Sequence, residues 1–125
     1  VKVKILVPMK SDSKFVDYAV RSYYLDLLNA GIEIFQYSKG FIHAKTMVCD
    51  SKIAMIGTAN MDSRSFDLNF EVNAIVYDKQ VANELAGIFY DDLKDSVQLN
   101  QTEWTKRSVL QKFMEKAVRL FSPLL

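Results

Sequence analysis

Hydrophobic and polar positions divide the first 38 residues into three predicted elements. Residues 1–8 (VKVKILVP) alternate apolar residues with lysine and then become fully apolar, which predicts a strand that ends at Pro8. Residues 11–31 repeat apolar side chains at helical spacing, between Ser11 or Ser13 as a cap and Gly31 as the stop. Residues 32–38 (IEIFQYS) predict a second strand, and the strand–helix–strand order favours parallel pairing.

The rest of the chain predicts a hairpin, a further strand and two helical regions. Apolar segments at residues 41–50 and 52–60 predict two strands joined by a tight turn at Asp50-Ser51. Residues 61–67 predict a polar, irregular segment, and residues 68–78 predict a strand. Helices are predicted at residues 79–97 and from residue 102 to Pro123. The expected fold class is α/β: a βαβ unit, then a hairpin, with one mixed β-sheet flanked by helices.

Length and composition indicate one soluble globular domain over residues 1–125. Half of the residues are hydrophobic, but no run of apolar residues is long enough to span a bilayer. The net charge of +1 argues against bulk electrostatic binding to nucleic acid, so no nucleic-acid partner is expected. The chain begins on a strand-like segment without methionine, and we expect it to be part of a longer polypeptide.

Metal and thiol chemistry are not expected. The single histidine and scattered carboxylates form a poor ligand set, so neither a metal nor another cofactor is predicted. Cys49 is the only cysteine, which excludes an internal disulfide. Its apolar neighbours Met47 and Val48 predict a buried strand thiol.

The residues around the hairpin combine the groups that a phosphodiester reaction needs. If residues 41–50 form a strand, His43 and Lys45 lie on the same side of it. A neutral imidazole is a nucleophile near physiological pH, and an ammonium beside it can hold an anion. The end of the second strand carries three further groups. Gly57 permits close backbone approach, Thr58 offers a hydroxyl and Asn60 offers an amide donor. Such donors suit the non-bridging oxygens of a phosphodiester, where charge builds in the transition state.

Glu71 supplies a carboxylate to the same set. The alternation of residues 69–76 predicts that Glu71 lies opposite the apolar side of its strand. From there a carboxylate could accept a hydrogen bond from the far nitrogen of His43, fix its tautomer and support its cationic form.

The full pattern resembles the HKD motif of the phospholipase D superfamily. It runs H-x-K-x4-D-x6-G-T-x-N, with His43, Lys45, Asp50, Gly57 and Asn60 at the motif positions. Threonine stands at position 58, where the family usually has serine, and this change retains the hydroxyl. Flanking segments at residues 1–13, 27–45 and 57–73 and the terminal SPLL resemble the carboxy-terminal half of bacterial cardiolipin synthases.

The resemblance implies a phospholipase D-like half with defined roles for its residues. His43 would be either the nucleophile, which forms a phosphohistidine, or the general acid/base. Lys45 and Asn60 would hold phosphate oxygens, with Thr58 as a further donor. Glu71 would orient the histidine. Asp50 belongs to the motif, but strand alternation places it on the opposite face from His43. We therefore expect Asp50 to support the hairpin turn, with direct catalysis as the lesser option.

The resemblance also implies a partner lobe, because these enzymes have two lobes with one HKD motif each and an active site between them. This chain has a single motif, so we expect it to need the amino-terminal HKD lobe of the same polypeptide or a second copy. The implied substrate is phosphatidylglycerol or another anionic phospholipid at the bacterial inner membrane. Two alternatives are a homodimeric phosphodiesterase or nuclease of the superfamily, and a non-catalytic lobe that binds phosphate or lipid head groups.

The last predicted helix allows two interpretations. Its apolar residues recur on one side, and its basic residues lie elsewhere: Leu110, Phe113, Ala117 and Leu120, against Lys112, Lys116 and Arg119. Such a helix can lie on an anionic bilayer, or its apolar stripe can pack on the sheet, which is the favoured interpretation. Arg64 and Arg107 could approach lipid phosphates, or they could be solvated or paired.

Overall fold

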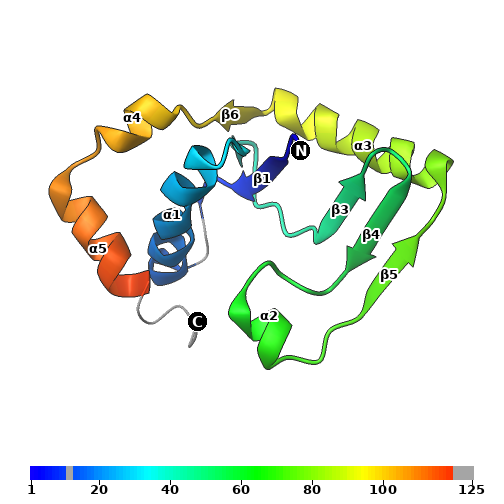
Figure 1. Cartoon of the computed structure of the whole chain (residues 1–125), viewed down its shortest axis with the longest axis horizontal. Coiled ribbons are helices and arrows are strands. Elements are labelled where there is room, and N and C mark those ends of the chain that lie inside the picture. The colour runs from blue at the N-terminus through cyan, green and yellow to red at the C-terminus, as the bar shows by residue number, and fades with distance from the viewer. Residues whose placement is uncertain (11–12, 120–125) are drawn as a thin grey trace. The chain divides into compact units, whose positions relative to one another are not determined.

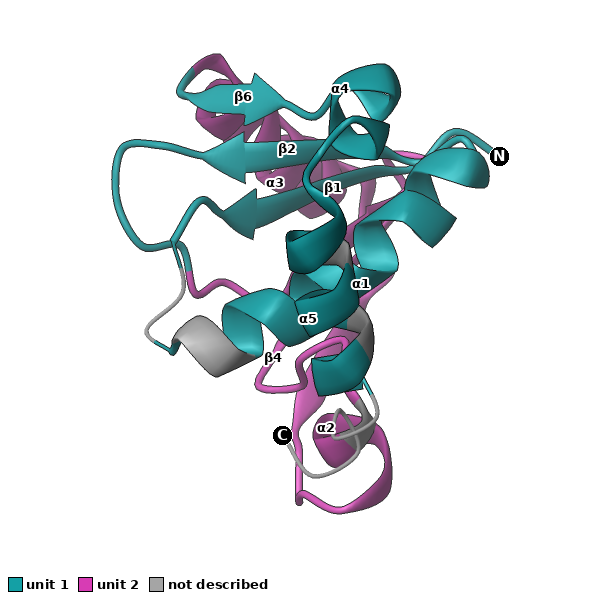
Figure 2. Cartoon of the chain, turned by 90° about the vertical axis from the view of Figure 1, so that its left-hand side faces the viewer, with its two compact units in different colours: residues 1–42, 95–125 teal, residues 43–94 magenta. Residues whose placement is uncertain are grey.

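The structure of the chain is a computed structural model that describes residues 1–10 and 13–119, without the side chains of residues 14, 15, 63, 112 and 116. Its elements fall into two compact units (Figures 1 and 2). Unit 1 comprises residues 1–42 and 95–125, and unit 2 comprises residues 43–94. The α/β fold class is confirmed, since each unit combines a small sheet with helices.

Unit 1 contains the predicted βαβ element. Its sheet has the order β1-β2-β6, in which β1 pairs with β2 in parallel and β6 pairs with β2 antiparallel. The helix between the two parallel strands ends next to Gly31, whose φ of 80° needs the conformational freedom of glycine. The elements of unit 1 are β1 (Lys4–Pro8), α1 (Lys14–Asn29), β2 (Glu33–Tyr37), β6 (Ser96–Gln98), α4 (Gln101–Thr105) and α5 (Val109–Arg119).

The core of unit 1 forms where α1, β2 and α4 meet. Tyr24, Ile34 and Trp104 are buried there, and Ile34 is fully inaccessible. The Tyr24 and Trp104 rings lie 5.3 Å apart between centroids in a tilted arrangement. Burial raises the pKa of the Tyr24 hydroxyl to about 12, so this side chain stays neutral at physiological pH.

Unit 2 is a three-stranded antiparallel meander with one long helix. The strand order is β3-β4-β5, and the helix α3 contacts β3 and β4. Ala54 on β4 and Ala82 on α3 are fully buried, and such small side chains permit close packing of a helix on a sheet. The elements are β3 (Thr46–Cys49), β4 (Ile53–Gly57), α2 (Ser63–Asp67), β5 (Asn73–Val76) and α3 (Lys79–Lys94).

Three predicted features of the middle of the chain differ from the structure. The strands form two three-stranded sheets instead of a single mixed one. The segment predicted as irregular contains α2, because the Asp62 side chain accepts a hydrogen bond from the Ser65 N–H at 2.8 Å and caps the helix. Residues 96–98 form β6 instead of continuing the preceding helix, since β2 offers them an edge for pairing. Cys49 is exposed, so the prediction of a buried thiol is wrong.

The carboxy-terminal region forms two helices, α4 and α5, instead of one. Asn100 caps α4 by accepting hydrogen bonds from the Thr102 and Glu103 N–H groups. α5 packs on α1, and its Leu110 and Phe113 are exposed, so the favoured interpretation of an apolar stripe packed on the sheet is wrong. The proposed cap Ser11, the stop at Pro123 and the last apolar position, Leu120, lie outside the described residues. No helix within the described part of the chain is both long and apolar enough to cross a membrane.

Candidate active site

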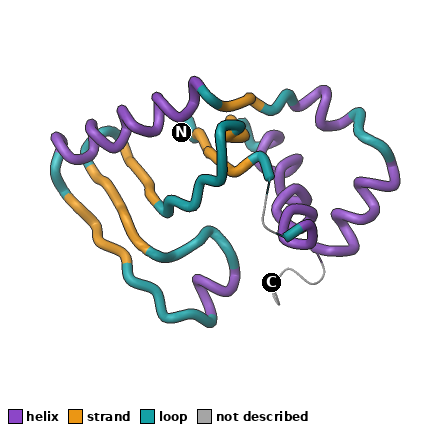
Figure 3. The backbone as a smooth tube through the Cα atoms, turned by 180° about the vertical axis from the view of Figure 1, so that it is seen from behind, coloured by secondary structure: helices purple, strands orange, loops and turns teal. Residues whose placement is uncertain are grey.

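His43 and Lys45 lie in the loop that leads into β3, not in a strand. Figure 3 shows the segment between β2 and β3 in the loop colour. The strand was predicted to begin at residue 41, whereas β3 begins at Thr46. Strand alternation therefore does not set the directions of the His43 and Lys45 side chains. Instead, the Lys45 Nζ donates a hydrogen bond to the His43 carbonyl oxygen at 2.8 Å. The Gly57 N–H donates to the Lys45 carbonyl oxygen at 3.1 Å, which ties this loop to the end of β4. The hairpin therefore brings Lys45, in the loop before β3, next to Gly57 at the end of β4.

A hydrogen-bonded network centred on Glu71 joins the other motif residues. The Thr58 hydroxyl donates to Glu71 Oε2 at 2.5 Å, and the Ser65 hydroxyl donates to Oε1 at 2.9 Å. The Asn69 amide donates to the same Oε1 at 3.4 Å. Ser65 also accepts a hydrogen bond from the Asn60 N–H at 3.0 Å, so it connects Asn60 with Glu71.

Ser65 is a member of the site that sequence reasoning missed. It is buried and lies on α2, a helix too short to produce an apolar periodicity. The available signal was the spacing of Asp62 and Ser65, which is typical of a capped helix start. Glu71 lies just before β5, so the prediction that it lies on a strand is wrong. Its carboxylate nevertheless accepts a hydrogen bond from Thr58, which directly follows β4.

These contacts hold the pKa of the Glu71 carboxyl below its usual range. The largest cause is the hydrogen bond from Thr58, followed by that from Ser65, with smaller contributions from Asn69 and from the positive charge of Lys45. Because the pKa is lower in the folded state than in the unfolded state, ionised Glu71 stabilises the folded unit above the unfolded pKa. That stabilisation is lost as the pH falls through the folded pKa.

We expect Thr58→Val to raise the pKa of Glu71 toward its ordinary value, because valine removes the shortest hydrogen bond to the carboxylate. A carbon-13 NMR titration of the Glu71 carboxyl measures this. Asn69→Ala is the matched control and should produce a smaller rise, since its hydrogen bond spans 3.4 Å. Equal rises of the Glu71 pKa in the two variants would contradict the larger contribution of Thr58 to the lowered pKa.

Thr58 also joins β4 to the segment before β5. Its N–H donates to the Val72 carbonyl oxygen at 3.0 Å, and its hydroxyl oxygen accepts from the Val72 N–H at 2.9 Å. A hydroxyl has a single proton to donate, and here that proton is directed to Glu71. In this arrangement Thr58 acts on the network around Glu71, and its role toward phosphate stays a prediction.

Gly57 is required by the close approach of two strands. It pairs with Asn73 across β4 and β5, and a Cβ atom at position 57 would collide with Asn73 Oδ1 and the Val72 carbonyl oxygen. The same Cβ would lie 2.7 Å from the Asn73 Cα, so backbone would have to move.

Gly57→Ala is therefore expected to destabilise the chain by about 1–3 kcal/mol, the usual cost of forcing extra volume into a packed site. Urea unfolding measures the loss. Gly87→Ala is the matched control: nothing lies within 4 Å of a Cβ there, and in the interior of α3 an alanine should stabilise by about 0.5–1 kcal/mol. Wild-type stability of Gly57→Ala would refute the steric requirement.

Asp50 lies at the opposite end of the hairpin from Lys45 and Gly57. Asp50 and Ser51 both adopt the left-handed conformation, with φ of 50° and 51°, and the Lys52 N–H closes the turn on the Cys49 carbonyl oxygen at 3.0 Å. Aspartate tolerates this conformation better than most residues, so its position favours a role in the turn. Of the two arginines considered for phosphates, Arg64 lies exposed on α2 and Arg107 binds Glu115 in unit 1.

Comparisons with known proteins relate the chain to one group of enzymes. Residues 1–93 match the family model described as cardiolipin synthase, PLD-like domain. The chain is 47% identical over all of its 125 residues to cardiolipin synthase 2 of Bacillus anthracis, and 49% identical to a cardiolipin synthase of Staphylococcus aureus strain N315. A cardiolipin synthase of Clostridium perfringens is 45% identical over the same length. The chain covers 24%, 25% and 26% of these three proteins, so it spans about a quarter of their length.

Proposed function

Because the chain belongs to the family of cardiolipin synthase PLD-like domains, we propose that it is the carboxy-terminal catalytic lobe of a cardiolipin synthase. It would transfer a phosphatidyl group from one phosphatidylglycerol to another and release glycerol. The observation that supports this best is the joining of the His43–Lys45 loop to the end of β4, where Thr58, Asn60 and Glu71 form one network. In this proposal the two units together make one lobe over residues 1–125.

The reaction proceeds in two displacements at phosphorus. In the first, a histidine nitrogen bonds to phosphorus, the bond to the glycerol oxygen breaks, and a second histidine gives its proton to that oxygen. In the second, the hydroxyl of another phosphatidylglycerol loses its proton to the second histidine and attacks phosphorus, and the phosphorus–nitrogen bond breaks. His43 fills one of these two roles, and the histidine of the partner lobe fills the other.

Lys45 and Asn60 stabilise the charge that develops on the non-bridging oxygens. The Lys45 ammonium has three donors and gives one to the His43 carbonyl oxygen, which holds the charge beside the histidine. Glu71, kept ionised by its hydrogen bonds and near Lys45, balances that charge. In this proposal its carboxylate also orients His43. The mechanism involves no metal ion. The lobe works at the bacterial inner membrane, where its anionic phospholipid substrate lies.

The test combines the mass of the chain in solution with phosphatidylglycerol turnover on the same sample. We expect a chain that is inactive alone and active once joined to the rest of the Staphylococcus aureus relative, in which this proposal places the second lobe. An active homodimer of the chain alone would instead favour a self-sufficient phosphodiesterase of the same superfamily. Full turnover by a monomer would refute the need for two histidines, and inactivity of the joined protein would favour a non-catalytic binding lobe.

A further inference from the structure

Helix α5 presents an exposed apolar face that nothing in the proposed reaction uses. It consists of Val109, Leu110, Phe113 and Met114, which are 81%, 71%, 66% and 43% exposed. Their spacing places all four on one side of the helix, and we call this the α5 apolar face. Large apolar side chains gathered on a surface mark a contact with another molecule or with lipid.

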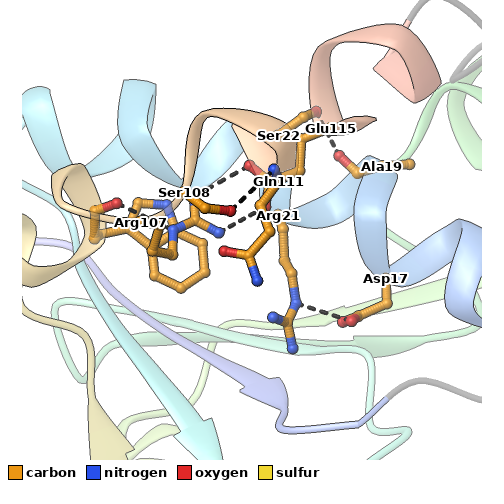
Figure 4. A network of polar contacts seen from close by, with 9 residues as sticks. Asp17, Ala19, Arg21, Ser22, Arg107, Ser108, Gln111 and Glu115 are labelled. Carbon is orange, nitrogen blue, oxygen red and sulfur yellow. Dashed lines mark hydrogen bonds and ion pairs between the residues drawn. The ribbon is translucent and has the colours of Figure 1, made fainter. Parts of the chain in front are cut away.

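The opposite side of α5 is the one that anchors the helix. Val118 and Glu115 are buried there, and α5 packs on α1. Arg107 donates two hydrogen bonds to Glu115, at 2.6 and 3.1 Å (Figure 4). Arg119 binds Asp26 of α1 at 2.8 Å. Since Val118, Glu115 and Arg119 anchor α5 in unit 1, the apolar face stays exposed.

Positive charge is concentrated on the same segment. Residues 106–119 contain five basic residues and one acidic residue, although the whole chain has a net charge of only +1. Two of these cations are compensated within unit 1, because Arg107 pairs with Glu115 and Arg119 pairs with Asp26, which leaves the segment and these partners with a net positive charge. At helical spacing, the lysines at positions 112 and 116 fall beside positions 109 and 113 of the apolar face. An apolar face on a positively charged segment is complementary to a bilayer rich in anionic lipid, which offers apolar chains below a layer of negative charge.

We propose that α5 is a membrane-surface helix, which lies in the interface of an anionic bilayer with the α5 apolar face among the acyl chains. The inference goes beyond the proposed function, because attachment of this kind requires neither turnover nor a second lobe. It gives unit 1 a role of its own: unit 1 holds the lobe on the lipid surface, while the hairpin of unit 2 supplies the chemical groups.

The test is cosedimentation of the full 125-residue chain with vesicles. Phosphatidylserine mixed with phosphatidylcholine serves as the anionic surface, because phosphatidylserine is not the proposed substrate, and pure phosphatidylcholine serves as the neutral one. We expect at least about tenfold tighter binding to the anionic vesicles, weakened by added salt. The double substitution Leu110→Ser and Phe113→Ser should reduce this binding about tenfold or more. Ile88→Ser, which removes an exposed apolar side chain from α3, should leave it unchanged.

A second measurement detects membrane insertion directly, without relying on variants that lose binding. Leu110→Trp adds a reporter at an exposed position, and its fluorescence should shift to the blue and be quenched by brominated lipid on anionic vesicles only. Absence of binding, or equal binding by the Leu110→Ser, Phe113→Ser double variant, would overturn the proposal. So would light scattering that shows self-association through this face, because the occupant would then be another copy of the chain. None of these outcomes depends on phosphatidylglycerol turnover, so the proposed function is tested separately.

Discussion

His43→Asn is expected to lower phosphatidyl transfer by at least about 10²-fold, and by up to about 10⁶-fold if His43 is the nucleophile. Asparagine has no nitrogen that can attack phosphorus or exchange a proton near neutral pH, although it can still form hydrogen bonds. The substitution is made in the protein that joins this chain to the rest of the Staphylococcus aureus relative, and turnover of labelled phosphatidylglycerol is measured.

The same variant separates the two roles that are open to His43. If His43 is the nucleophile, the variant forms no covalent phosphatidyl-enzyme. If it is the general acid/base, a covalent intermediate on the partner histidine should persist longer than in the wild type. Lys52→Gln changes an exposed residue of the hairpin turn and serves as the control that should retain activity. Wild-type turnover by His43→Asn would remove His43 from the mechanism.

Glu115→Ala is expected to destabilise the chain by about 3–5 kcal/mol, the usual cost of leaving one member of a buried ion pair without its partner. The side chains of Arg107 and Glu115 are only 19% and 7% exposed, and their nearest atoms lie 2.6 Å apart. The Arg107 guanidinium also lies 3.3 Å from the centre of the Trp104 ring and donates to the Trp104 carbonyl oxygen at 3.0 Å. It therefore cannot leave for solvent without breaking the contacts that join α4 to α5 (Figure 4).

Urea unfolding measures this loss, and the chain contains a matched control. Lys94 and Asp91 form an ion pair of the same 2.6 Å length, but their side chains are 75% and 73% exposed. Asp91→Ala should cost less than about 1 kcal/mol, because water screens the pair and replaces its hydrogen bonds. If the two substitutions lower the free energy of unfolding equally, burial does not determine how much the Arg107–Glu115 pair contributes to stability.

Local pattern was sufficient for the features that depend on neighbouring residues. The alternation in residues 1–8, the helical spacing after it and the stop at Gly31 predicted the βαβ element of unit 1, and the structure confirms it. Asp50-Ser51 predicted the hairpin turn, since few residues accept the left-handed conformation. The two strands on either side of that turn pair as predicted, and the Gly57–Lys45 hydrogen bond closes the open end of the hairpin.

Contacts between distant residues could not be predicted in this way. Periodicity shows which side of an element is apolar but not what that side contacts, so the pattern of α5 did not reveal that Glu115 and Val118 are buried while Phe113 is exposed. Elements such as α2 and β6 are too short to show a period, and Ser65 was missed with the first of them. The sequence by itself determined the βαβ element of unit 1 and the hairpin turn at Asp50-Ser51. Only the tertiary structure decided which strands share a sheet and which side of α5 remains exposed. It also decided that the hydroxyls of Thr58 and Ser65 donate to Glu71. Each of these features depends on the packing free energy between residues far apart in the chain.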